Sequence, residues 1–331
     1  MRCVSSKQQG MSLIELMIAM TIGLILLTGV LQIALRGNQN YRMHEASSRV
    51  QESGRFAMDL LSRDIRMADF WGCAKSITQI TNNLDPAGDG YANFTFTGGI
   101  GGTDGASGDP DTITIAGAIG EGLFLQPPFG PQESANVKVS AGNDLNQADV
   151  ILLSDCLMGD IFQISNADPG TSGTVVHNTG SATEPGNYNP GACGHGANAH
   201  CLSKVYEGDA QIYKLQTVTY AIATSPFNEP VLTRSVNGVT AVRLVEGVEN
   251  MQFLYGEDTN NDNNVDIYRT ATNVSDWEAV INVKISLLIR SPEAVLDVNQ
   301  TYEYDGVTIT SSDKRLRRVF TGIVTLRNRT L

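Results

Sequence analysis

The sequence is poor in charge and has no excess of basic residues, and these shortages exclude two classes of protein. Charged residues make up 18% of the 331 residues, and the formal net charge is −12. An acidic surface repels phosphate backbones, so nucleic acid is not an expected partner. Hydrophobic residues reach 41%, which is too many for a disordered polyelectrolyte and enough for a sizeable core.

Residues suited to acid–base or nucleophilic catalysis are also scarce. The four histidines are His44, His177, His195 and His200. The first lies in an amphipathic stretch and the others lie in Gly-rich segments, with no nucleophile elbow, paired acid motif or phosphate-cradling loop in the sequence. We therefore do not expect an enzyme, and no cofactor is required.

An uncharged, mostly apolar run lies near the N-terminus. Residues 16–35, LMIAMTIGLILLTGVLQIAL, would extend roughly 30 Å as a helix, about the thickness of one hydrocarbon core. No small-residue cleavage site follows the run, as it would after a secretory signal. Arg2 and Lys7 precede it, which favours a cytoplasmic N-terminus and a single pass through the inner membrane into the periplasm.

One carboxylate does not suit an ordinary membrane anchor. Glu15 lies at the start of the apolar run, and a carboxylate at the helix centre would cost roughly 2.5–3.5 kcal/mol. It follows Met11 by four residues, one helical turn. A cut after Gly10 would free an amine on Met11 that could neutralise the carboxylate, within one subunit or between neighbours.

The segment KQQGMSLIELMIAM, residues 7–20, resembles the leader region of class III, type IV prepilins. Such leaders have a short, weakly basic segment ending in a glycine, here Gly10, followed by an apolar residue and then the pattern Ser-Leu-Ile-Glu. The resemblance implies cleavage after Gly10 by prepilin peptidase and N-methylation of Met11. Met11 departs from Phe, the commonest first mature residue of the family. A lipid anchor on Cys3 is not expected, because a lipoprotein cysteine follows its apolar segment.

Helical periodicity continues beyond the apolar run. The apolar positions at spacings of three, four and seven are Ala46, Val50, Ala57, Leu60, Leu61, Ile65 and Ala68. Charged residues lie between them, so we expect an amphipathic helix packed on a sheet. Continuous from Met11 to about Phe70, the helix would be roughly 90 Å long, a length natural for a filament spine. Gly37 and Gly54 could mark bends within it.

Three further segments narrow the resemblance to the minor pilins of the PilW family and, more distantly, to the J-type minor pseudopilins of type II secretion. They are RVQESGRFAMDLLSRDIRMADFWGC (49–73), VEGVENMQFLYGEDTNND (245–262) and KRLRRVFTGIVTLRNRTL (314–331). The resemblance implies a minor pilin in an inner-membrane complex that primes type IV pilus assembly and is incorporated at the tip. Its implied partners are other minor pilins, the major pilin and a tip adhesin, and its final location is the pilus at the cell surface.

Two alternatives stay open at this point. The chain could be a minor pseudopilin of type II secretion, which genetic neighbourhood would separate from a pilus subunit. A different class is a membrane-anchored periplasmic adhesin or calcium-stabilised binding protein. That alternative predicts no cleavage at Gly10 and a function that survives Glu15→Ala.

Strand patterns separated by Gly, Pro, Asn and Asp clusters dominate the remainder. The predicted strands are 111–116, 149–153, 211–223, 250–255, 279–289 and 318–326. We expect an α+β fold of the type IV pilin kind, with a long N-terminal transmembrane and spine helix on a mainly antiparallel sheet, and an additional β-rich lobe. The expected divisions are a leader (1–10), a transmembrane half-helix (11–35), an amphipathic periplasmic half-helix (36–72) and a β-rich domain (73–331) with a variable, loop-rich insertion at about 81–198.

Four cysteines follow the leader. Cys73, Cys156, Cys193 and Cys201 are an even number in an exported domain, which predicts two disulfides with three possible connectivities. Cys193 and Cys201 would close a short loop. With His195 and His200 they also provide zinc-ligand chemistry, although the tight spacing and an oxidising periplasm favour a disulfide.

The segment Glu257–Asp266, EDTNNDNNVD, alternates oxygen-bearing side chains as the first part of a calcium loop does. The candidate ligands are Asp258, Asn260, Asp262, Asn264 and Asp266. Asn263 stands where Gly is preferred, and Arg269 occupies the twelfth position, where a bidentate Glu is normal. The competing interpretation is a solvated Asx-rich turn between two strands.

A basic group lies near the C-terminus. It consists of Lys314, Arg315, Arg317 and Arg318. It could bind an acidic neighbour, but we favour a solvated start of a strand.

Overall fold

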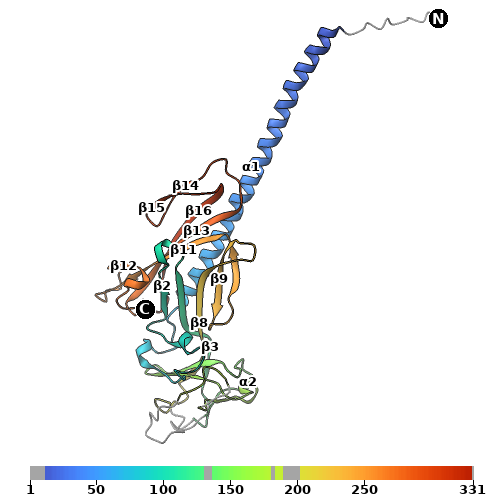
Figure 1. Cartoon of the computed structure of the whole chain (residues 1–331). Coiled ribbons are helices and arrows are strands. Elements are labelled where there is room, and N and C mark those ends of the chain that lie inside the picture. The colour runs from blue at the N-terminus through green and yellow to red at the C-terminus, as the bar shows by residue number, and fades with distance from the viewer. Residues whose placement is uncertain (1–11, 130–135, 180–182, 189–201, 330–331) are drawn as a thin grey trace, which may run out of the picture.

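A long helix, α1 (Leu13–Met67), leads from the N-terminal segment into the folded domain (Figure 1). The computed structural model describes residues 12–129, 136–179, 183–188 and 202–329. At 1.5 Å per residue, the 55 residues of α1 extend about 80 Å, which confirms the predicted spine. The helix is continuous through Gly37 and Gly54, and it ends three residues before Phe70.

The larger of two main sheets has eight strands, and its neighbours pair antiparallel except β1 with β6. Along the main path the strands are β1 (Ile80–Asn82), β6 (Gly159–Gln163), β5 (Val150–Ser154), β8 (Gln211–Thr224), β3 (Thr112–Phe124) and β2 (Ile100–Thr103). From β8 the sheet also branches to β9 (Pro230–Val236) and then β10 (Val242–Glu246).

The second main sheet has four antiparallel strands and carries α1. Its order is β12 (Ile267–Arg269), β11 (Val248–Glu257), β13 (Val280–Ala294) and β16 (Arg315–Thr325). Two strand pairs lie apart from it, β14 (Thr301–Tyr304) with β15 (Val307–Thr310) and β4 (Asn136–Lys138) with β7 (Thr174–Val176). The short helix α2 (Pro169–Ser172) and five 3-10 turns complete the described elements: η1 (Ile77–Gln79), η2 (Tyr91–Phe94), η3 (Ala106–Gly108), η4 (Ala271–Asn273) and η5 (Arg327–Arg329).

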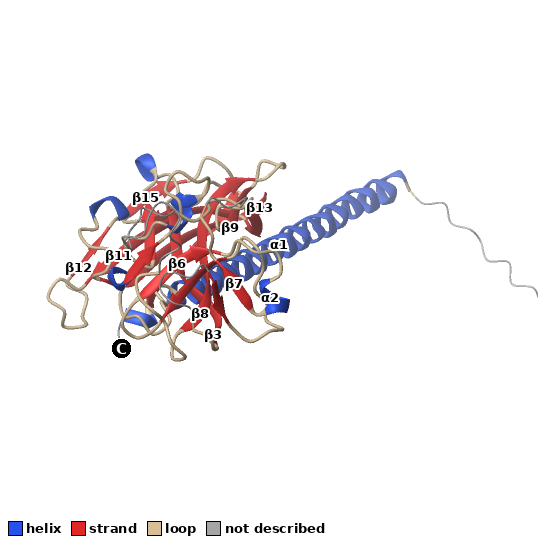
Figure 2. Cartoon of the chain, turned by 90° about the horizontal axis from the view of Figure 1, so that it is seen from below, coloured by secondary structure: helices blue, strands red, loops and turns tan. Residues whose placement is uncertain are grey.

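The predicted fold class is confirmed, with a spine helix on antiparallel sheet and an extra β-rich lobe. All six predicted strands coincide with observed ones, namely β3, β5, β8, β11, β13 and β16. In Figure 1 the extra lobe, with α2, lies at the end of the domain opposite the protruding part of α1, and Figure 2 shows the sheets gathered around the other half of the helix.

The segment 81–198 contributes both to the lobe and to the main core. Its strand β3 pairs with β8 along most of its length, and Ile113 and Ile115 lie in the same core cluster as Leu61 of α1. A second cluster, around Phe162 and Ile212, fills the lobe. The segment therefore shares the core of the spine through β2 and β3 and contributes to a separate core in the lobe.

Candidate functional site

The N-terminal end of α1 is closed by a capping box. The Glu15 amide donates to Ser12 Oγ at 3.2 Å, and the Ser12 amide donates to Glu15 Oε2 at 3.1 Å. The box satisfies helix amides that otherwise have no partner, and the carboxylate is also favourable near the positive end of the helix dipole. Gly10 and Met11, the predicted cleavage and methylation positions, lie outside the described residues.

The first half of α1 presents apolar side chains to its surroundings on every side. From Leu13 to Leu35 its large hydrophobic side chains are between 43% and 76% exposed. The Thr28 hydroxyl donates a hydrogen bond to the Leu24 carbonyl at 2.7 Å, so this polar group has its partner within the helix. In length and composition α1 is suited to cross a membrane. A helix that is apolar all round needs lipid or other helices as its surroundings.

The second half of α1 is packed against its own domain. Its buried residues are Ala46, Val50, Gly54, Ala57, Leu61 and Ile65, which confirms the predicted face and adds Gly54. A Cβ on Gly54 would lie 2.2 Å from the Phe320 ring of β16, so the glycine lets the strand approach the helix closely. This is a packing role, and not the bend expected from the sequence.

Polar contacts join the packed half of α1 to strands of its own domain. The Tyr220 hydroxyl donates to Asp64 Oδ2 at 2.7 Å, and Arg234 Nε lies 3.2 Å from the same oxygen. Burial, with the hydrogen bond to Asp64 next in importance, raises the pKa of the Tyr220 phenol above its usual range. Nearer the first half of α1, Arg42 forms an ion pair with Glu293 at 2.9 Å, although both side chains are largely exposed.

The far end of α1 is joined to residues about 260 positions away in the chain. Asn328 Nδ2 donates to the Ala68 carbonyl at 2.8 Å, and Arg329 Nε donates to Asp69 Oδ2 at 2.6 Å. Donors and a cation at the C-terminal end of a helix satisfy its free carbonyls and complement its dipole. Asp69 has a left-handed backbone, with φ of 63°, so the chain turns sharply there.

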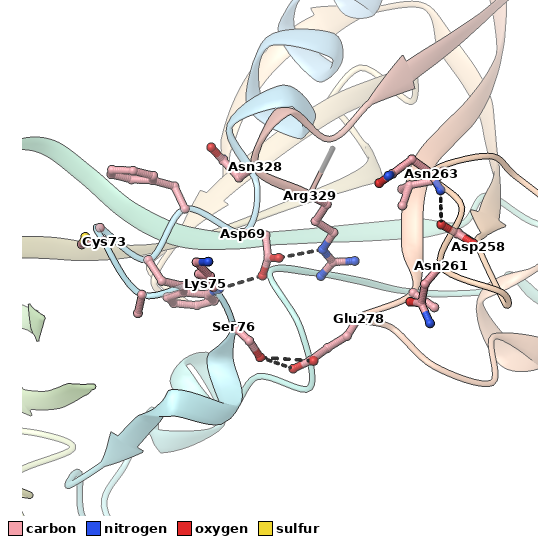
Figure 3. A pocket seen from close by; sticks show the side chains of 16 residues that line it. Asp69, Cys73, Lys75, Ser76, Asp258, Asn261, Asn263, Glu278, Asn328 and Arg329 are labelled. Atoms are coloured by element: carbon pink, nitrogen blue, oxygen red, sulfur yellow. Dashed lines mark hydrogen bonds and ion pairs between the residues drawn. The ribbon is translucent and has the colours of Figure 1, made fainter. Parts of the chain in front are cut away.

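A cavity of about 560 Å³ lies beside this end of the helix (Figure 3). The turn after α1, the Asp258–Asn263 loop, Glu278 and the Asn328–Arg329 segment line it. Its polar groups largely bind one another, as when Ser76 Oγ donates to Glu278 Oε1 at 3.1 Å. Among the described residues, no three His, Cys, Asp or Glu side chains lie close enough together to hold a metal ion.

The predicted calcium loop forms an Asx-rich turn. Asp258 accepts the amides of Asp262 and Asn263 at 3.2 and 2.7 Å, and Asn261 and Asn263 have φ of 61° and 63°. The other candidates join in, because Asp266 accepts from Thr259, Asn260 accepts from Asp262 and Asn264 donates to Asp262. The structure thus gives these oxygens amide partners, while calcium binding stays a prediction.

One disulfide lies within the described residues. Cys73, just after α1, forms a disulfide with Cys156 of the β5–β6 turn, with their Cα atoms 4.4 Å apart. This bond selects one pairing among those that the sequence left open. Cys193 and Cys201, with His195 and His200 between them, lie outside the described residues.

The interpretation of the basic group as solvated is wrong for two of its members. The Arg317 side chain is 5% exposed and contacts Glu249 at 2.6 Å and Asp313 at 2.5 Å. Arg315 contacts Glu229 at 2.9 Å, whereas Lys314 and Arg318 are exposed. The hydrogen bond from Arg317 lowers the pKa of Asp313 to about 2. Spacing alone could not reveal the whole network, because Glu229 and Glu249 come from distant parts of the chain.

The two histidines that the structure describes lie in different surroundings. His44 is exposed on α1, and His177 is buried with its ring 4.6 Å from that of Phe162. His44 thus lies within α1, and His177 directly follows β7. Sequence reasoning missed the ion pair of Asp69 with Arg329, whose only local signal was an acid directly after the helical periodicity.

Two family models match parts of this chain. The family model "Type IV Pilus-assembly protein W" matches residues 219–328, and the "Prokaryotic N-terminal methylation motif" matches residues 5–31. No curated protein sequence matches the chain significantly. Among solved structures, a type IV-like pilin from Thermus thermophilus aligns over 86% of this chain and 98% of its own, at 10% identity and a TM-score of 0.36. The chain is therefore similar to type IV pilus-assembly proteins in two parts, a methylation motif near its N-terminus and a pilus-assembly region near its C-terminus.

Proposed function

We propose that this chain is a minor pilin that joins other minor pilins in an inner-membrane complex, primes assembly of the type IV pilus and is incorporated at its tip. The methylation motif implies processing by prepilin peptidase. The single observation that carries the proposal is the contrast within α1. One half is packed into a folded domain, and the other is an exposed apolar helix.

The exposed half would serve two environments in succession. Before assembly it holds the subunit in the bilayer as a single pass, with the β-rich domain in the periplasm. During assembly it exchanges lipid contact for contact with the helices of neighbouring subunits, the major pilin among them. The packed half transmits this motion to the domain, because α1 is one continuous helix.

Glu15 would set the axial position of the subunit. In the structure its carboxylate accepts the Ser12 amide, so it is engaged locally while the leader is attached. Cleavage after Gly10 would place a charged amine on Met11, one residue before that cap. A neighbour's amine then offers the carboxylate a stronger, charge-assisted partner in a medium where an unpaired carboxylate is costly.

Intact-mass analysis of the membrane-extracted protein tests the proposal. We expect the loss of residues 1–10 and the gain of one methyl group. Gly10→Val should leave the full-length precursor in the inner membrane and block incorporation into pili. Gly29→Val, the same change within the apolar run, should still be cleaved. A shortened, methylated product from Gly10→Val would show that the leader assignment is wrong.

A further inference from the structure

We propose that the side of the domain nearest the apolar half of α1 rests on the phospholipid headgroups of the bilayer that this half spans. This membrane-side rim consists of residues 36–42 of α1, residues 292–299 at and after the end of β13, and Lys314. The inference rests on the proposed function, because it requires α1 to cross a bilayer. It is carried by the position of the rim along α1, by its exposed side chains and by its charge.

Strand β13 runs toward the apolar half of α1. Its partner β16 runs in the same direction as α1, since Phe320 lies against Gly54 and the later Asn328 binds the end of the helix. Because β13 is antiparallel to β16, it runs back along the helix, and near its end Glu293 pairs with Arg42 at 2.9 Å. The next strand, β14, lies on the side of the domain from which α1 protrudes (Figure 1). The chain after β13 is therefore at the end of the domain nearest the bilayer.

The rim lies within reach of the headgroups. Arg42 follows Leu35, the last residue of the apolar run, by seven positions, which is about 10 Å along the helix. The headgroup layer outside the hydrocarbon core is roughly 5–8 Å thick. A tilt of about 20°, which is usual for membrane helices, lowers the side of the domain toward which the helix leans by a few ångströms. Residues beyond Glu293 therefore reach the headgroups when α1 leans toward β13.

The exposed side chains of the rim suit an interface between water and lipid. Val298 is 72% exposed beside the exposed Asp297. The Leu296 amide donates to the Lys314 carbonyl at 2.9 Å, which holds this loop beside the start of β16. On α1, Tyr41 is 69% exposed, and tyrosine is enriched where membrane meets water. Contact with the headgroups would remove apolar surface of both side chains from water.

The charge of the rim differs from that of the whole chain, whose formal net charge is −12. The rim has three basic and two acidic residues, namely Arg36, Arg42, Lys314, Glu293 and Asp297. A zwitterionic headgroup offers a phosphate to the cations and an ammonium to the acids. This nearly balanced surface can therefore lie on the bilayer without the repulsion that the acidic remainder of the chain would meet at a phosphate layer.

Fluorescence quenching in reconstituted bilayers tests this inference. The full-length chain is placed in vesicles of phosphatidylethanolamine and phosphatidylcholine that include lipid with a nitroxide on its headgroup. The two native tryptophans are far from the rim, because Trp71 follows α1 and the Trp277 carbonyl accepts from Arg329 beyond β16. After subtraction of the wild-type signal, Val298→Trp should lose at least half of its emission. Unquenched emission from this variant would overturn the inference.

Val239→Trp is the matched control. Val239 is 67% exposed, close to the 72% of Val298, but it lies in the connection between β9 and β10. This connection binds Thr217 of β8, four residues from Tyr213, whose ring packs on Phe70 beyond the far end of α1. Val239→Trp should keep its emission, and both variants should keep the wild-type melting temperature. A blue shift of Val298→Trp without quenching would show that protein covers this position, which would also overturn the inference.

A pair of charge reversals tests the contact with phosphate. Lys314→Glu, combined with Val298→Trp, should reduce the quenching at least twofold, because it places a third acid on the rim. Arg318→Glu makes the same change in charge at an exposed position about 13 Å farther along β16 from the rim. It should leave the quenching unchanged. An equal loss in the two variants would contradict the contact of Lys314 with the headgroups.

One more variant separates failure of this inference from failure of the proposed function. Leu24→Trp places the probe within the apolar half, and lipids brominated in their acyl chains should quench it if α1 spans the bilayer. Quenching of Leu24→Trp without quenching of Val298→Trp would refute the rim contact alone. Absence of quenching in Leu24→Trp would refute the membrane span, and with it both the proposed function and the rim contact.

Discussion

The two halves of α1 belong to one unbroken helix, yet they satisfy their apolar surfaces in different ways. From Leu13 to Leu35 the side chains are exposed all round, while from Ala46 to Ile65 one face is buried on β13, β16 and neighbouring strands. The second half obtains its partners from its own chain. The first half must obtain them from lipid or from other subunits.

This contrast separates folding from assembly. Changes in the packed half should alter the free energy of unfolding of the domain, because their contacts are internal. Changes in the apolar half should leave that free energy unchanged and alter incorporation into a filament. The predictions below test whether the two halves are as independent as the structure indicates.

The largest effect is expected at Glu15. Glu15→Ala should be processed normally but reach the pilus at least tenfold less, as measured by its amount in sheared pili relative to the membrane. Glu15→Gln is the matched control, since Gln can complete a capping box without carrying charge. We expect it to assemble as poorly as Glu15→Ala. Normal assembly of the Gln variant would show that capping matters and that charge pairing does not.

Two leucines give the next largest contrast. Leu61 is fully buried, and Leu61→Ala should lower the free energy of unfolding by about 2–5 kcal/mol. Leu24 is 64% exposed, and Leu24→Ala should leave the unfolding of the domain unchanged. Chemical denaturation of the detergent-extracted protein measures both. A comparable loss from Leu24→Ala would mean that the apolar half contributes to the folded domain.

Substitution of two glycines, one in the packed half of α1 and one outside it, is expected to change stability by a smaller amount. Gly54→Ala places a methyl group against the Phe320 ring and should cost about 1–3 kcal/mol. Gly37 has no neighbouring atom within 4 Å of its would-be Cβ, so Gly37→Ala should stabilise the helix by up to about 1 kcal/mol. Thermal melts compare the two. Adding Phe320→Ala to Gly54→Ala should recover part of the loss, and if it does not, the close approach is not the cause.

The smallest effect concerns acid stability of the sheet that carries the helix. Arg317 lowers the pKa of Asp313 from 3.8 to about 2. The ionised carboxylate therefore stabilises the fold fully above about pH 4, and this contribution is lost as the pH falls toward 2. Asp313→Asn should flatten the pH dependence in that range by about 1 kcal/mol, a value reduced for the partial exposure of the side chain. The free energy of unfolding of the wild type and of Asp313→Asn is measured by chemical denaturation at pH 5 and pH 2.5. An equal change between the two pH values in both proteins would argue against the ion pair.

Local pattern predicted the elements well. The spacing of Ala46, Val50, Ala57 and Leu61 identified the packed face because helical periodicity is a property of neighbouring residues. The alternation in 279–289 identified β13 in the same way. Glu15 was recognisable because a carboxylate beside an apolar run is costly without a partner.

Contacts between distant segments were not predictable from such patterns. The pairing of Cys73 with Cys156 depends on how the β5–β6 turn meets the end of α1. Arg317 looked solvated in sequence because Glu249, which binds it, lies 68 positions away. Gly54 looked like a weak point, although its small size is what lets Phe320 approach. In each case the contacting residue is distant in the sequence, and only the tertiary fold places it beside its partner.

The contact of Asn328 and Arg329 with the end of α1 has a consequence for the order of biogenesis. The spine is synthesised first, but β13, β16 and the residues that close its far end come more than 200 positions later. The apolar half can therefore enter the membrane while the amphipathic half still lacks its partners. If the chain is exported as the proposed function requires, the domain can close around the spine only after the rest of the chain has crossed, so export would be complete before a subunit assembles.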